Sequence, residues 1–426
     1  MKILNSNSKN FDKVLDSLLL KRKNKVQSSS VSVIGIIKDV KKNGDKALLK
    51  YEKRFNKNTV IVPSQKQISN SIKSLDKKVK QAIDIAYNRI YKFHSLQKFK
   101  NISYTDKLKN RLEYKYVPID SVAIYVPGSS ASYPSSVLMN AVPAIVAGVK
   151  RVIMINPGFK GKQNPAVLYA ARKCKIKEIY SIGGPSAIAA AAYGTKKIKK
   201  VNKIVGPGNA YVAAAKKEVF GDVGIDMIAG PSEVTVVADK TSNIEWIASD
   251  LIAQAEHDET SQSILVTNNK KIISEVNSSL KKQLKMLPKK KIASKSIKNF
   301  GLAIFSKNKT ETYKIINSIA PEHLELCIKR PEKFLKNITN AGSIFLGNYS
   351  PEAIGDYIAG TNHVLPTSGA AKFSSGLSVY DFLKRQSIIK ISKSGIERLG
   401  PSVINLANYE NLEGHANSIK LRLKGD

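Results

Sequence analysis

Short apolar runs alternate with helical patterns through the middle of the chain, beginning at residue 121. Strands that alternate with helices are typical of βαβ units, and they predict a parallel sheet covered by helices. The predicted strands of this first series are residues 122–126, 151–155, 178–182 and 203–205. The predicted helices between or after them lie near residues 165–173, 187–193 and 210–220.

A second series with the same alternation follows. Its predicted strands are residues 234–238, 263–266, 302–305, 324–327 and 343–346. Its predicted helices are residues 243–257, 270–285, 310–318 and 331–338. The fold class is therefore α/β, with two parallel sheets, and the similar pattern of the two halves indicates an old duplication.

The two ends of the chain have a different pattern. In residues 1–25, apolar side chains recur at helical spacing from Phe11 to Leu19, which predicts a small helical extension. Residues 30–115 read as lysine-rich helices, and His94 among them is interpreted as structural or solvated. After residue 378 the pattern predicts a polar, helical tail.

Length and composition limit the class of protein. A chain of 426 residues is long enough for two or more domains. The longest apolar run, residues 141–149, is far shorter than the roughly 20 residues that span a bilayer, and no secretory signal is visible. Two cysteines allow neither a disulfide framework nor a cysteine zinc site, so we expect a reducing, cytoplasmic compartment.

The formal net charge of +37 raises the hypothesis of a protein associated with nucleic acid. The excess is mostly lysine, however, and it is spread along the whole chain. There is no arginine-rich tract, no aromatic-basic platform and no zinc-finger spacing. We therefore expect no specific nucleic-acid partner and no membrane partner.

Candidate chemistry begins at the five histidines, of which His257, His323, His363 and His415 lie in stretches dense in carboxylates, glycine or proline. Gln254 and His257 are three residues apart at the end of a predicted helix, so they share one face. An amide oxygen and an imidazole on one face suit a metal or a polar substrate. The alternative reading is a solvated helix end.

Two further stretches carry groups for acid–base or metal chemistry. Glu322 and His323 lie just before a predicted strand, where an imidazole can exchange protons at neutral pH and a carboxylate can activate water. A satisfied loop histidine is the alternative. Asp356 could complete a metal set with Gln254 and His257, and His415 is the candidate for the fourth ligand. Such nitrogen and oxygen ligands suit zinc.

Three strand-to-helix turns are rich in glycine: residues 183–184, 206–209 and 230–233. Glycine lets the backbone approach a phosphate, and the following helix N-terminus favours negative charge. No G-x-G-x-x-G motif is present, and glycines of this kind also occur for steric reasons alone.

Together these stretches resemble histidinol dehydrogenase. The pieces that carry the resemblance are residues 133–140 (YPSSVLMN), 206–209 (GPGN), 229–233 (AGPSE), 254–257 (QAEH), 321–325 (PEHLE), 355–369 and 413–415 (EGH). The resemblance implies two Rossmann-like domains, one inserted in the other, and a homodimer with shared sites. Its implied boundaries are 1–24 for an N-terminal extension, 25–124 with 232–377 for the first domain, 125–231 for the NAD-binding domain, and 378–426 for a dimerisation extension.

The resemblance also implies oxidation of L-histidinol to L-histidine through histidinaldehyde, with two NAD and one water. Glu322 and His323 would be catalytic, with His323 as base and Glu322 activating water. One zinc ion per subunit would be held by Gln254, His257, Asp356 and His415. Histidinol would contact Ser232, Gln254, His257, His323, Asp356, Glu410 and His415. NAD would contact Tyr125, Gly184, Ser186 and Asn209.

The chain departs from the family pattern at two positions near the implied NAD site. Ser186 stands where the family usually has glutamine, and Ser129 replaces a customary glycine. These departures motivate an alternative, a zinc hydrolase that has lost NAD. Cys327 lies on an apolar predicted strand and is interpreted as a core residue rather than a nucleophile.

Overall fold

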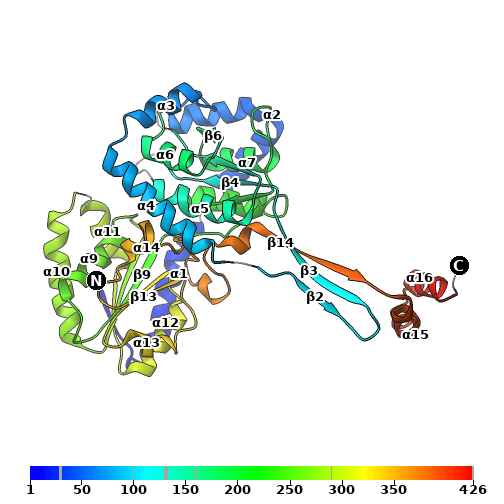
Figure 1. Ribbon diagram of the computed structural model, residues 1–426. Coiled ribbons are helices and arrows are strands. Elements are labelled where there is room, and N and C mark those ends of the chain that lie inside the picture. Colours follow the sequence, from blue (N-terminus) through cyan, green and yellow to red (C-terminus); the bar gives the residue numbers. More distant parts are fainter. Residues whose placement is uncertain are drawn as a thin grey trace. The chain divides into compact units, whose positions relative to one another are not determined.

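The computed structural model describes residues 1–27, 31–97, 99–128, 133–158, 160, 162–288 and 290–424 (Figure 1). The chain forms two compact units. The main unit comprises Met1–Leu96 and Asp120–Asp381, and the second unit comprises Gln97–Ile119 and Phe382–Asp426. Each unit is described by itself below.

The first sheet of the main unit has six strands, all parallel. Their order is β1 (Lys2–Asn5), β11 (Leu302–Phe305), β10 (Gln262–Thr267), β9 (Glu233–Ala238), β12 (His323–Cys327) and β13 (Ser343–Leu346). Every residue of β9, β10 and β12 is buried, because helices cover both faces of the sheet.

Each face of this sheet packs against its own helices (Figure 1). One face is covered by α9 (Ile244–Ala255), α10 (Lys270–Met286) and α11 (Lys290–Phe300). The other is covered by α1 (Phe11–Gln27), α12 (Lys309–Ile319) and α13 (Pro331–Leu335). The short helix α14 (Glu352–Tyr357) follows β13 in the chain, and the 3-10 helices η1 (Ala370–Lys372) and η2 (Val379–Phe382) come later.

The second sheet of the main unit has five parallel strands. Their order is β6 (Glu178–Tyr180), β5 (Arg151–Ile155), β4 (Ser121–Tyr125), β7 (Lys203–Val205) and β8 (Gly224–Ile225). One face packs against α2 (Val31–Asn56), α7 (Gly184–Tyr193) and α8 (Ala210–Val219). The remaining helices are α5 (Pro134–Ala147), which contacts β4 and β5, and α3 (Gln65–Lys73), α4 (Lys77–His94) and α6 (Pro165–Lys173), which pack with it or with one another.

The predicted α/β fold with two parallel sheets is confirmed. Helices α2, α3 and α4, which the implied boundaries assign with residues 232–377, make their main helix contacts with α5, α6, α7 and α8. The boundaries themselves stay a prediction. His94, at the end of α4, is buried, which agrees with a structural rather than a solvated histidine.

The second unit holds a three-stranded antiparallel sheet and two helices. The strand order is β14 (Leu383–Lys390), β3 (Arg111–Pro118) and β2 (Ile102–Thr105). The helices α15 (Lys393–Tyr409) and α16 (Glu413–Lys424) follow, which confirms a helical tail for residues 393–424.

Three parts of the element prediction were wrong. Within the predicted helical region 30–115, residues 102–105 form β2 and residues 111–115 belong to β3, and residues 383–390 form β14 within the predicted helical tail. Residues 2–5 form β1, which pairs with β11 far along the chain, so the N-terminal extension is not wholly helical. Among the described residues, no helix has the length and apolar content that crossing a membrane requires.

Candidate active site

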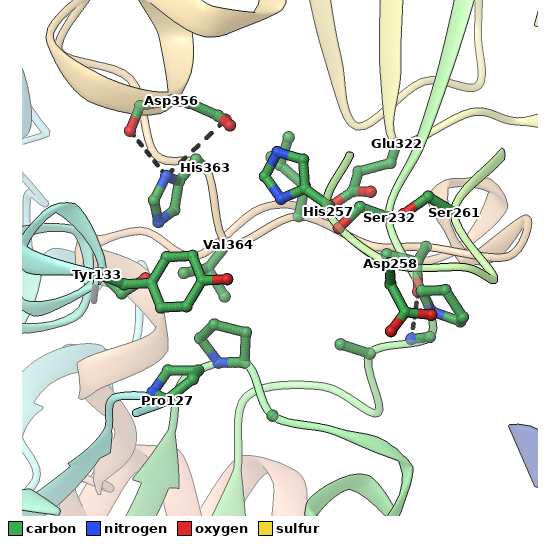
Figure 2. Close-up of a pocket in the computed structure, with 18 of the residues that line it drawn as sticks. Pro127, Tyr133, Ser232, His257, Asp258, Ser261, Glu322, Asp356, His363 and Val364 are labelled. Carbon is green, nitrogen blue, oxygen red and sulfur yellow. Dashed lines mark hydrogen bonds and ion pairs between the residues drawn. The ribbon is translucent and has the colours of Figure 1, made fainter. Parts of the chain in front are cut away.

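A cavity of about 530 Å³ opens where the two sheets of the main unit meet. From the six-stranded sheet come residues at the amino ends of strands, such as Ser232 before β9 and His323 at the start of β12. From the five-stranded sheet come Pro127 after β4 and the loop 207–209 after β7. Figure 2 shows Tyr133 and Pro127 on one side of the cavity, with His257, Ser232 and Glu322 across from them.

In the His323 ring, Nδ1 is hydrogen-bonded and Nε2 has no hydrogen-bond partner among the described residues. Nδ1 lies 3.1 Å from the carbonyl oxygen of Glu233. A carbonyl can only accept, so this bond places the proton on Nδ1. Nε2 is buried, has no hydrogen-bond partner in the described part of the chain, and lies 3.8 Å from a carboxylate oxygen of Asp356. Burial lowers the pKa of His323 to about 4, so the ring is neutral at pH 7 with a lone pair on Nε2.

Glu322 lies beside this imidazole in a site that favours its protonated form. Its Oε2 atom accepts the main-chain N–H of Glu233 at 2.9 Å and lies 3.8 Å from Nδ1 of His323. Burial raises the pKa of Glu322 well above its usual range, and the charge of Glu233 adds to this effect. A carboxyl group with a raised pKa can both take and return a proton near neutral pH.

A set of metal-compatible ligand atoms lies in the same cavity. One ligand atom each of His257, Glu352 and Asp356 lies within 4.8 Å of the others. Gln254 belongs to the last turn of α9, and its carbonyl accepts the His257 N–H at 3.3 Å. The Gln254 side chain is fully buried, and neither of its amide atoms has a hydrogen-bond partner within the described ranges. A buried amide without a partner is costly unless a ligand satisfies it.

Glu352 and His363 line the cavity, but neither of them was given a role in the site predicted from the sequence. Glu352 is buried, and its Oε1 atom lies 3.5 Å from Nδ1 of His323. His363 Nδ1 lies 2.8 Å from the Asp356 carbonyl oxygen, and burial lowers the pKa of this histidine. Glu352 could have been found from its spacing, because it lies one helical turn before Asp356. His363 was visible only as a histidine in a glycine-rich stretch.

The residues implied for NAD lie at the carboxyl edge of the five-stranded sheet. The Tyr125 hydroxyl accepts the Gly184 N–H at 3.1 Å, and burial raises the pKa of Tyr125 to about 12. Ser186 is buried, and its hydroxyl donates to the Gly183 carbonyl at 3.1 Å. Asn209 caps α8 by accepting the N–H groups of residues 211 and 212. Asn209 lines the cavity, whereas the other three are not part of its lining. Ser129 lies outside the described residues.

The remaining predicted site residues divide between the units. Ser232, His257, His323 and Asp356 all line the cavity. Glu410, at the end of α15, and His415, in α16, belong to the second unit, and both side chains are exposed. The structure therefore brings part of the predicted set together and leaves the meeting of Glu410 and His415 with it as a prediction.

Cys327 is a core residue, as the sequence predicted. It lies at the far end of β12 from His323 and packs with the apolar cluster under α9 and α10. Burial raises the pKa of its thiol, which keeps the sulfur protonated and unreactive.

The chain is similar in sequence and in structure to histidinol dehydrogenases. A sequence model of the histidinol dehydrogenase family matches residues 19–423. A histidinol dehydrogenase of Pelagibacter ubique (strain HTCC1062) is 70% identical over 425 residues, 100% of this chain and 99% of the relative. A histidinol dehydrogenase 1 of Nostoc sp. is 47% identical over 427 residues, 100% of this chain and 99% of the relative. The crystal structure of histidinol dehydrogenase from Elizabethkingia anophelis superposes with a TM-score of 0.91 at 38% identity, covering 100% of this chain and 98% of that one.

Proposed function

Because the chain belongs to the histidinol dehydrogenase family and is thus an oxidoreductase of histidine biosynthesis, we propose that it oxidises L-histidinol to L-histidine through histidinaldehyde. The reaction would use two NAD and one water. The observation that carries this proposal is the free, buried Nε2 atom of His323 beside Glu322, in one cavity with His257 and Asp356. It is an acid–base pair placed next to a set of ligand atoms.

The donor set fits a divalent cation. Gln254, His257 and Asp356 offer the nitrogen and oxygen atoms that zinc accepts, and the unsatisfied Gln254 amide supports a ligand there. Glu352 adds a carboxylate that the resemblance did not name. When bound, zinc would orient the imidazole and amine of the substrate. His415 would be the fourth ligand.

The loop before α8 fits a dinucleotide phosphate. A Cβ at Gly206 would lie 2.2 Å from the Tyr125 carbonyl oxygen, and one at Gly208 would lie 2.4 Å from the Val212 side chain. Only glycine allows this close packing, which brings the main chain of the loop to the surface of the cavity where a phosphate could approach it. NAD would supply the hydride acceptor for both oxidations.

Proton transfer is assigned to two residues of the chain. Nε2 of His323 takes the hydroxyl proton as the C–H hydrogen of the alcohol leaves as hydride, giving the aldehyde. Glu322, once it has released its own proton, takes a proton from water as the water oxygen bonds to the aldehyde carbon. Nε2 then takes a hydroxyl proton from the resulting hydrate as the second hydride leaves, giving the carboxylic acid. Both residues return their protons to solvent between steps.

We also propose that two copies of the chain share their sites. The resemblance assigns Glu410 and His415 to the partner's site, and their exposure leaves them accessible to another chain. The helices α15 and α16 expose large apolar side chains, which is unusual for a surface that stays in water. The most exposed are Leu406 at 64%, Tyr409 at 89% and Leu421 at 59%.

The proposal is tested by incubating zinc-loaded protein with histidinol and NAD and following NADH. No NADH from the loaded protein would refute the dehydrogenase. The hydrolase alternative predicts no NAD binding, so calorimetric titration with NAD separates the two, and normal binding would argue against the hydrolase. The net charge also raised the hypothesis of a protein associated with nucleic acid. Nucleic-acid binding that disappears at physiological salt would reduce that hypothesis to a non-specific charge effect.

A further inference from the structure

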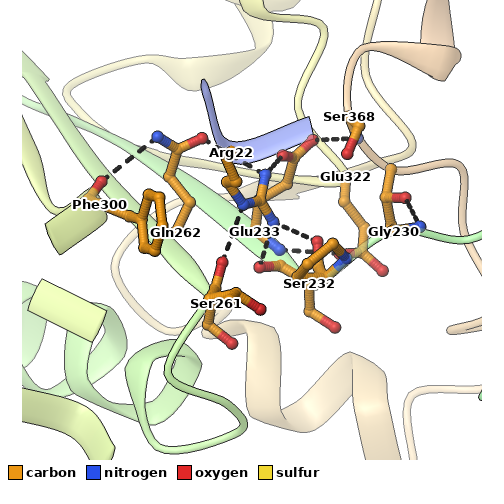
Figure 3. A network of polar contacts seen from close by, with 12 residues as sticks. Arg22, Gly230, Ser232, Glu233, Ser261, Gln262, Phe300, Glu322 and Ser368 are labelled. Atoms are coloured by element: carbon orange, nitrogen blue, oxygen red, sulfur yellow. Dashed lines mark hydrogen bonds and ion pairs between the residues drawn. The ribbon is translucent and has the colours of Figure 1, made fainter. Parts of the chain in front are cut away.

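The guanidinium of Arg22 is a buried cation beneath the cavity. It comes from α1, far in sequence from the site, and the residue is only 2% exposed. Nε donates to the Thr260 carbonyl at 2.9 Å, and Nη2 donates to the Ser232 carbonyl at 2.9 Å and to the Pro231 carbonyl. Nη1 binds the carboxylate of Glu233 (Figure 3). One side chain thus joins two loops that line the cavity.

The main chain of Glu233 contacts both proton-transfer residues. Its N–H donates to Glu322 Oε2 at 2.9 Å, and its carbonyl oxygen accepts from Nδ1 of His323 at 3.1 Å. The Glu233 side chain is held at both oxygens, by Arg22 and by the Ser368 N–H at 3.0 Å. Any shift of residue 233 would therefore move the acceptor that fixes the His323 tautomer and the donor that fixes Glu322.

We propose that Arg22 and Glu233 are positioning residues that orient His323 and Glu322 through the main chain of residues 231–233. This inference rests on the proposed function, because it assigns how that acid–base pair is held. Arginine is suited to the task, since its planar fork can bind a carboxylate and several carbonyls at once, whereas a lysine ammonium is a single point of charge. Replacing arginine by lysine would keep the buried charge and lose the fork.

Arg151 provides a matched control on the other sheet. It binds both oxygens of Glu178 at 2.8 Å and donates to the carbonyls of Lys199 and Lys200 at 3.1 Å. Arg151 begins β5, at the amino edge of the five-stranded sheet, whereas the cavity lies at the carboxyl edge. The two arginines therefore make similar contacts, and only Arg22 touches the loops of the site.

The test compares Arg22→Lys with Arg151→Lys in the zinc-loaded enzyme. We expect kcat to fall about 10- to 100-fold in Arg22→Lys, because misplaced acid–base groups slow the chemical step. The KM for histidinol should stay within about threefold, since the proposed metal ligands lie outside residues 231–233. Arg151→Lys should keep kcat within about twofold. An unchanged kcat in folded Arg22→Lys, or an equal fall in Arg151→Lys, would overturn the proposal.

A second readout does not depend on activity. Nitrogen NMR of the histidine rings distinguishes the two tautomers, and comparison with His323→Asn identifies the His323 signal among the five histidines. We expect the proton on Nδ1 in the wild type and a mixture of tautomers in Arg22→Lys. A wild-type ring with its proton on Nε2 would overturn the proposal even if Arg22→Lys did not fold. Absence of histidinol oxidation by the wild type would instead refute the proposed function and leave the tautomer measurement valid.

Discussion

At the scale of single residues, the proposed chemistry depends on the His323 imidazole being neutral and held in one orientation. Its Nδ1 proton is committed to a main-chain carbonyl, so only Nε2 can act on a substrate. Burial lowers the pKa of His323 to about 4, and the ring is therefore ready to accept a proton at any pH above that value.

Replacing His323 by alanine removes this acceptor and leaves His257 and Asp356 in place. We expect turnover to fall by about 10²- to 10⁴-fold while histidinol still binds, because the proton acceptor is lost and the metal anchor is kept. Steady-state NADH production and calorimetric titration with histidinol measure the two quantities. His94→Ala, at an equally buried histidine of α4, is the control. Loss of affinity without loss of turnover would show that His323 is not the base.

Glu52 of α2 gives a prediction about pH and stability. It accepts the Gly183 N–H at 2.7 Å, and burial raises its pKa from 4.5 to about 7. The folded protein therefore holds a proton that the unfolded chain has released, and this stabilisation is complete below pH 4.5 and is lost as pH rises through about 7.

The glutamine side chain of the Glu52→Gln variant cannot ionise, so the variant does not lose this stabilisation as pH rises. We expect its free energy of unfolding, relative to the wild type, to increase by roughly 1–3 kcal/mol between pH 4.5 and pH 8. Urea unfolding at several pH values measures the difference, with Glu218→Gln at an exposed position of α8 as control. A difference that does not vary with pH would contradict the raised pKa.

At the scale of elements, the central strands of the two parallel sheets were predictable because both their faces are buried. β9 is apolar for most of its length and β10 has an apolar centre, and their predicted ends differ from the observed ones by one residue at most. The strands that were missed lack this signal. β1 is a four-residue edge strand whose partner lies 300 residues away, and β2, β3 and β14 are largely exposed, so no apolar face marks them.

Candidate-site residues that belong to a sequence motif were predictable. Residues that reach the site only through tertiary packing were not. The stretch around Glu322 and His323 could be read from residue types at the start of a strand. Arg22 could not, because an arginine among lysines at the end of an amphipathic helix reads as a solvated side chain. Its burial depends on where α1 packs, which the local pattern does not encode.

Packing of α1 can be tested by one substitution in its apolar face. Leu15 is 2% exposed and contacts the core under the six-stranded sheet, so Leu15→Ala should lower the free energy of unfolding by about 2–4 kcal/mol. Leu20 in the same helix is 56% exposed, and Leu20→Ala should change it by less than about 0.5 kcal/mol. Urea denaturation measures both. Equal effects would mean that α1 does not dock through Leu15.

At the scale of the whole molecule, the cavity of the main unit lies between the amino edge of the six-stranded sheet and the carboxyl edge of the five-stranded sheet. Acid–base residues come from the amino ends of strands in the six-stranded sheet, and the glycine loop before α8 comes from the carboxyl end of a strand in the other. In the proposed function, the substrate would contact residues of the first sheet and the redox cofactor would contact residues of the second. The charge of +37 is spread over the chain, and the expectation of no specific nucleic-acid partner stays a prediction.

Shared sites predict complementation between two inactive variants. His323→Ala lacks the base, and His415→Ala should bind zinc weakly. In a mixed dimer, one site would combine an intact His323 with the partner's intact tail. Random mixing should restore up to about a quarter of wild-type activity, because half of the dimers are mixed and each has one complete site. Activity no higher than that of either variant after subunit exchange would contradict sharing.

We propose that one cavity carries a histidinol molecule through two successive oxidations. The most direct measurement is the number of NADH molecules formed for each histidinol consumed by zinc-loaded enzyme, with histidine determined as product. We expect two NADH and one histidine per histidinol, and loss of both on removal of the metal. One NADH per histidinol with the aldehyde released, or full activity without metal, would contradict it.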